Sequence, residues 1–164
     1  MEELLYSRER AVEYAHKWAF SRNPKFFNFD SLGGDCTNFA SQCIFAGANI
    51  MNFTPIFGWF YRSVSDRTAS WTGVEFLYNF LTGNEGVGPY AKEVPIEEVL
   101  PGDIVQINFS GNKWAHSPVV VQVKAPVSAK NILVAAHTYD ADNRPLSQYN
   151  YKKVRGLHIL GVRG

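Results

Sequence analysis

The chain has 164 residues, a formal net charge of +1 at neutral pH and 46% apolar residues. This length supports a single domain, residues 1–164, with its own core, and the apolar content excludes a disordered chain. The basic residues are scattered apart from Lys152, Lys153 and Arg155, so no nucleic-acid partner is expected. Neither a membrane span nor a signal peptide is expected, because the first five residues are acidic and short.

The first half of the chain predicts helices. A first helix should follow Ser7, a favourable N-cap, and end at Asn23-Pro24. After an aromatic loop over 25–34, apolar residues at helical spacing predict a second helix that begins at Cys36, with Gly47 as its C-terminal stop.

Cys36 is the first candidate for chemistry. In the first turn of a helix its sulfur would face unpaired backbone N–H groups and the positive end of the helix dipole, and both favour thiolate. Gly33 and Gly34 would let the backbone turn and leave the sulfur uncovered. The alternative is a small buried cysteine behind an ordinary turn. Cys43 lies two helical turns from Cys36, so no disulfide can join them.

Aromatic residues over 49–69 predict either the wall of a binding cleft or cover for the core, and Trp59 is the candidate platform there. Trp114 is a second candidate for substrate binding. A third helix is predicted from a Ser70 cap to Gly83, followed by a loop over 83–89.

After Leu100 the pattern changes to strands. These are predicted at Asp103–Phe109, Ala115–Val123, Ile132–His137 and Tyr149–Val162, with a polar loop over Thr138–Ser147. Helices followed by an antiparallel sheet predict an α+β fold with segregated halves.

Two of the four histidines are placed to act together. If the hairpin loop over 124–131 is centred near residues 126 and 127, facing positions sum to 253, which pairs His116 with His137. Such partners lie about 4.5 to 5.5 Å apart at Cβ, so one ring could orient the other beside Cys36. Asp140 and Asp142, just past the strand, are reserve candidates for the orienting group.

Other interpretations stay open. The two histidines could simply satisfy each other or water, and a zinc site of Cys36, His116 and His137 lacks the closely spaced ligand pairs typical of such sites. His16 and His158 have no neighbours suited to catalysis and are expected to be structural. No metal and no cofactor are expected.

Four segments in order carry a family resemblance: GGDCTNFASQCIFAG, LPGDIVQI, WAHSPVVV and VAAHTYD. Together they resemble the bacterial putative amidase domain family, a branch of the papain-like NlpC and CHAP group of cysteine amidases and peptidases. The resemblance extends from about Tyr6 to the last strand. It implies a papain-like fold in which the helix that carries the cysteine packs on an antiparallel sheet.

The resemblance also implies roles: Cys36 as nucleophile, His116 as base and His137 as orienting group. Backbone N–H groups of Asp35 and Cys36 would form part of an oxyanion hole, since they lie at the helix start. The implied substrate is an amide bond in bacterial cell-wall peptides, or peptidoglycan, and the implied location is extracellular or at the cell surface. A thiol acyltransferase with the same triad and a non-catalytic peptide-binding module are the alternatives.

Overall fold

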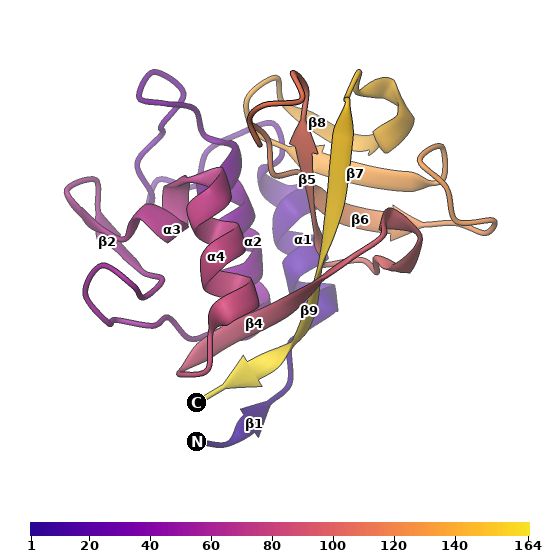
Figure 1. Cartoon of the computed structure of the whole chain (residues 1–164). Coiled ribbons are helices and arrows are strands. Elements are labelled where there is room, and N and C mark those ends of the chain that lie inside the picture. Colours follow the sequence, from indigo (N-terminus) through magenta and orange to yellow (C-terminus); the bar gives the residue numbers. More distant parts are fainter.

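The structure, a computed structural model that describes all residues 1–164, has an α+β architecture with its helices gathered beside an antiparallel sheet (Figure 1). This confirms the α+β class predicted from the sequence. The helices are α1 (Arg8–Trp18), α2 (Cys36–Ala48), α3 (Ala69–Thr72) and α4 (Val74–Gly83), with 3-10 turns at Ile96–Glu98 and Leu146–Gln148. The strands are β1 (Glu3–Leu4), β2 (Tyr61–Ser63), β3 (Asp66–Arg67), β4 (Gly88–Val94), β5 (Ile104–Asn108), β6 (Val119–Val123), β7 (Ile132–Ala136), β8 (Ala141–Pro145) and β9 (Lys153–Arg163).

The large sheet has the strand order β1-β9-β5-β6-β7-β8. Strands β1 and β5 pair with different parts of one edge of β9, and β4 pairs with the opposite edge. Strands β2 and β3 form a separate hairpin. The long strand β9 ties the ends of the chain together, because Glu3 of β1 lies opposite Arg163, and the two termini lie side by side (Figure 1). None of the four helices has the length and apolar character needed to cross a bilayer.

Helix α2 begins at Cys36, as predicted, and Figure 1 shows it among the other helices on the side of the sheet. The predicted N-cap of α1 is also confirmed, since the Ser7 hydroxyl accepts a hydrogen bond from the Arg10 N–H. The predicted stop at Gly47 is wrong: α2 continues to Ala48 and ends at Asn49 in the left-handed conformation. Gly47 instead permits close packing, because a Cβ there would lie 2.6 Å from the Tyr6 ring.

The predicted third helix is two helices. Gly73, with extended backbone angles, separates α3 from α4, and Thr68 precedes α3. Ser70 is not a cap, since its hydroxyl donates to the carbonyl of Gly58 and so fastens α3 to the preceding loop. The sequence pattern missed this break because the apolar residues keep their helical spacing across Gly73.

The sheet departs from the prediction at four places, one of which is the start of the last strand, predicted at Tyr149 but found at Lys153. Residues 88–94 form β4 although the segment up to Pro89 was expected to be a loop, and β8 lies within the predicted loop over 138–147. The strand predicted from Ala115 begins only at Val119. Both faces of the sheet are covered, because Val119 and Val121 belong to the main core whereas Val120 belongs to a smaller cluster on the opposite face.

Asp103, in the Pro-Gly-Asp turn before β5, links the helical and sheet parts of the chain. Its buried carboxylate accepts hydrogen bonds from Arg8 at 2.7 Å, His158 at 2.8 Å and the Ile159 N–H at 2.9 Å. This pairing gives His158 a structural partner, as the sequence interpretation expected.

Candidate functional site

Cys36 lies at the first position of α2, on the wall of an open cavity of about 330 Å³. Gly33 and Gly34 line the same cavity and both have positive φ angles, 87° and 97°, that favour glycine. A Cβ at Gly33 would meet no atom within 4 Å, so its requirement is conformational. The two glycines thus form the turn that leads into α2, as predicted, but the thiol is not uncovered, because Cys36 is buried.

Two segments meet at the thiol. The Thr37 hydroxyl lies 3.7 Å from the sulfur, and backbone groups of Thr37 and Ser117 lie close enough to lower the pKa of the thiol. The Thr37 and Ser117 hydroxyls are themselves 3.1 Å apart, which joins the start of α2 to the segment that carries His116. The sulfur therefore lies beside the residue that follows His116.

The expectation that Cys36 rests as a thiolate is not met. Burial raises the pKa of its thiol above the usual value, the donors from Thr37 and Ser117 only partly offset this, and the Asp35 charge adds to the rise. The helix start does not compensate for desolvation, because only 8% of Cys36 is exposed. The cysteine rests as a neutral thiol and needs a base to become a nucleophile.

His116 stands apart from the other histidines. His16, His137 and His158 each have a carboxylate partner, whereas no hydrogen bond joins the His116 ring to any group, Cys36 included. Burial, aided by the nearby Arg144 charge, lowers the pKa of His116 to about 4, so its imidazole is neutral at pH 7. A neutral imidazole with unoccupied ring nitrogens is competent to accept a proton.

The predicted pairing of His116 with His137 is wrong in register. In the hairpin of β6 and β7, Val119 faces Ala135 and Val120 faces Val134, so facing positions sum to 254 instead of 253. A shift of one residue turns a side chain to the opposite face of a sheet. His116 also precedes β6, and its backbone instead forms a bridge with Ile107 of β5.

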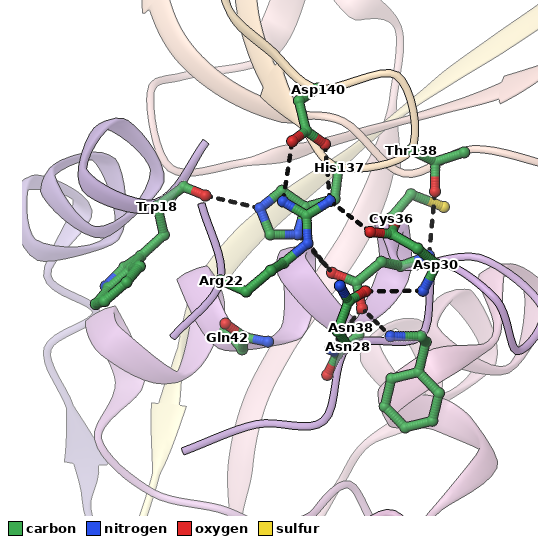
Figure 2. Close-up of polar contacts among 12 residues, drawn as sticks. Trp18, Arg22, Asn28, Asp30, Cys36, Asn38, Gln42, His137, Thr138 and Asp140 are labelled. Atoms are coloured by element: carbon green, nitrogen blue, oxygen red, sulfur yellow. Dashed lines mark hydrogen bonds and ion pairs between the residues drawn. The ribbon is translucent and has the colours of Figure 1, made fainter. Parts of the chain in front are cut away.

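His137 is occupied elsewhere. Its Nδ1 lies 2.5 Å from the Asp35 carboxylate and its Nε2 lies 2.7 Å from the Trp18 carbonyl, with both side chains of the His137–Asp35 pair 1% exposed. Figure 2 shows His137 held in this way, with the Cys36 sulfur pointing away from the ring. The structure therefore does not bring His137 to His116.

The Asp35 side chain, next to Cys36 in the chain, connects the start of α2 to neighbouring segments. Its side chain makes no N-cap hydrogen bond and instead accepts from His137, Asn38 and the Phe29 N–H. Although burial opposes ionisation, these hydrogen bonds hold the pKa of the Asp35 carboxyl below its usual value. The result is a buried carboxylate that ties the start of α2 to the end of β7 and to the 25–34 loop.

The reserve candidates Asp140 and Asp142 do not approach His116. Asp140 pairs with Arg22 at 2.9 Å, and Arg22 also contacts Asp30 and Asp35, as Figure 2 shows. Asp142 pairs with His16 at 2.8 Å. Both aspartates thus pair with side chains of α1 or of the residues that follow it, Asp142 with His16 and Asp140 with Arg22.

The proposed oxyanion donors divide into two cases. The Asp35 N–H donates to the Thr138 hydroxyl at 3.1 Å, so it is not directed at the cavity, and this part of the expectation is corrected. The Cys36 N–H has no partner in the chain, as expected for the first residue of a helix. Of the two proposed donors, only the Cys36 N–H is therefore free to bind an oxyanion.

The two candidate tryptophans differ. Trp59 is fully buried, and its Nε1–H donates to the Ser41 hydroxyl, so it belongs to the core and cannot contact substrate. Trp114 lines the Cys36 cavity, with the Arg155 guanidinium 4.0 Å from its ring centroid.

No three His, Cys, Asp or Glu side chains converge as a metal-binding group, and His137 uses both ring nitrogens for hydrogen bonds.

Sequence reasoning missed three participants: Ser117, Tyr149 and Arg144. Tyr149 packs beside the His116 ring, with 5.5 Å between the ring centroids. Ser117 directly follows the histidine in the WAHS segment, which was the one available signal. Arg144 lies in the segment predicted as a loop, and Tyr149 was expected only as the first residue of the last strand.

A buried thiol at a helix start, beside the segment that carries an unpaired neutral histidine, is a site suited to acyl transfer. The comparisons agree with that class. A family model described as "Putative amidase domain" matches residues 5–160, and the chain belongs to this family. An uncharacterized protein of Bacillus subtilis strain 168, YhbB, is 34% identical over 142 residues, covering 85% of this chain.

The chain spans 43% of the length of YhbB, so it corresponds to less than half of that relative. No solved structure matches the chain significantly.

Proposed function

We propose that this domain is a cysteine amidohydrolase or peptidase with Cys36 as nucleophile and His116 as base. The observation that carries the proposal is the placement of the thiol in an open cavity beside Ser117, the residue that follows the one histidine without a hydrogen-bond partner. Membership of the putative amidase domain family supports amide bonds as the target. The papain-like NlpC and CHAP grouping is also part of the proposal. A fold of that kind would likewise pack the helix that carries the cysteine on an antiparallel sheet.

In the first half of the reaction, His116 takes the thiol proton while the Cys36 sulfur bonds to the amide carbonyl carbon. The Cys36 N–H stabilises the charge that develops on the carbonyl oxygen. The C–N bond then breaks, His116 returns the proton to the leaving amine, and a thioester remains on Cys36.

In the second half, His116 takes a proton from water, and the water oxygen bonds to the thioester carbon. The C–S bond breaks, the sulfur regains a proton from His116, and a carboxylic acid leaves. His137 enters this scheme as a positioning residue: through Asp35 it fixes the start of α2, and it does not touch the reacting atoms.

The proposed substrates are amide bonds in bacterial cell-wall peptides, reached at the cell surface or outside the cell. The test is incubation with purified peptidoglycan and with a peptide library, read by mass spectrometry. We expect cleavage to a new amine and a new carboxylate, insensitive to EDTA and abolished by iodoacetamide. If activity is instead lost in EDTA and restored by zinc, the thiol mechanism is wrong.

The same assay with added glycinamide separates hydrolysis from acyl transfer, since both proceed through the thioester. Products that carry glycinamide in place of a free carboxylate would identify the protein as a thiol acyltransferase. We expect water to be the dominant acceptor.

A further inference from the structure

A second cavity, of about 530 Å³, shares Ala115 with the Cys36 cavity and is lined by His116. Its remaining wall comes from Phe109 after β5, from residues 138–139 after β7, from Arg144 on β8 and from residues 148–150, which include Tyr149. The proposed mechanism makes no use of this space. It borders the base directly, so whatever occupies it lies next to the reacting amide.

Arg144, on β8, is the charged group of this cavity. Arginines 8, 22, 155 and 163 each pair with a carboxylate, whereas Arg144 has no carboxylate partner although its residue is partly buried. Its Nε is buried without a hydrogen-bond partner, and its Nη2 donates to the Gln148 carbonyl at 3.3 Å. A buried guanidinium donor without an acceptor is costly unless a ligand supplies one.

Tyr149 adds a second unpaired group. Its hydroxyl is buried without a partner, and the Arg144 guanidinium lies 4.3 Å from its ring centroid, which holds the two side chains together. Burial raises the pKa of Tyr149, so the hydroxyl remains a neutral donor. Two buried groups that can donate hydrogen bonds therefore border one cavity beside His116.

We propose that this cavity is a subsite for a carboxylate of the substrate, bound by Arg144 with help from the Tyr149 hydroxyl. Guanidinium groups bind carboxylates through paired, charge-assisted hydrogen bonds, and no acidic residue of the chain lines the cavity to compete.

This subsite rests on the proposed function for its orientation. Because His116 protonates the leaving amine, the carboxylate belongs to the amine half of the amide. The preferred substrate class is thus an amide whose amine half is an amino acid with a free carboxylate, either the α-carboxylate or one on a side chain.

The test measures the binding of small probes to the full chain carrying Cys36→Ala, a change that removes turnover. Binding is monitored by the NMR chemical shifts of the His116 ring. Three probes are compared: N-acetylalanine, N-acetylaspartic acid α-amide and N-acetylalaninamide. We expect at least one acid to bind about tenfold or more tightly than the uncharged amide. The preferred acid identifies the source of the carboxylate.

The preference should disappear in Arg144→Gln, shrink in Arg144→Lys, and persist in Arg10→Gln, an exposed arginine also without an ion pair. Equal binding of all three probes, no saturable binding of either acid, or a preference that survives Arg144→Gln would overturn the subsite. None of these results depends on hydrolysis. Failure of the subsite is therefore distinct from failure of the proposed function, which the cleavage assay decides.

Discussion

Replacing His116 by alanine is expected to lower kcat/KM for amide hydrolysis by about 10²- to 10⁴-fold, because the neutral Cys36 thiol then has no base. The fold should be retained, since the His116 ring makes no hydrogen bond that alanine would break. The matched control is His16→Ala, which removes a half-exposed histidine paired with Asp142 and should leave kcat/KM unchanged. Equal activity of the folded His116→Ala variant and the wild type would remove His116 from the mechanism.

The pH profile of the wild type gives a second measure of His116. The base must be neutral, and burial lowers the pKa of His116 to about 4. We therefore expect kcat/KM to be maintained as the pH falls through 6.5 and to be lost only as it falls through about 4. Since kcat/KM reports the free enzyme, an acidic limb near 6.5 would contradict a buried, neutral base.

Replacing Asp35 by alanine is expected to destabilise the protein by about 3 to 5 kcal/mol, because it leaves His137, Asn38 and the Phe29 N–H without their buried acceptor. For a chain of this length the melting temperature should fall by roughly 6 to 20 °C. Asp35→Asn preserves the shape and one acceptor oxygen, so it should lose less.

The control for this prediction is Asp142→Ala, which breaks the half-exposed pair with His16 and should cost at most about 1 kcal/mol. Melting curves recorded by circular dichroism provide the comparison. If the Asp35→Ala and Asp142→Ala variants have the same melting temperature, the hydrogen bonds of Asp35 do not hold the start of α2.

The parts of the fold that were predicted correctly depend on local signals. The Ser7 cap and the start of α2 at Cys36 are set by residues within one helical turn. The Gly33-Gly34 turn is equally local, because it depends on positive φ angles that glycine adopts without strain. The ends of these elements depend on distant contacts. Gly47 continues α2 because Tyr6, from the start of the chain, packs against it.

Cys36 and His116 were proposed as site residues from residue type and placement, and their roles stay predictions. The partner of His137 could not be predicted from the sequence. The β6–β7 register depends on a bulge between Val120 and Gln122 and on a strand start at Val119, neither of which has a sequence pattern. The short strand β8, which carries Arg144, was hidden because its sequence ADNRP is typical of a loop.

Trp59 shows the limit of composition as a guide. Aromatic residues in a segment without periodicity fit a cleft wall and a core equally well, and only the tertiary contacts decide between them. In the structure the Trp59 ring packs against Trp71 and Phe80, and Ser41 accepts its N–H, so the residue is structural.

The most direct test of the central claim, that Cys36 carries the amide hydrolysis, compares wild type, Cys36→Ala and Cys43→Ala on the peptide or peptidoglycan fragment that the wild type cleaves. Cys43 is the matched control, since it is a fully buried cysteine of the same helix. We predict that kcat/KM falls by about 10⁴-fold or more in Cys36→Ala and stays near wild type in Cys43→Ala, with all three proteins folded. Cleavage of the same bond by folded Cys36→Ala at the wild-type rate would contradict the account.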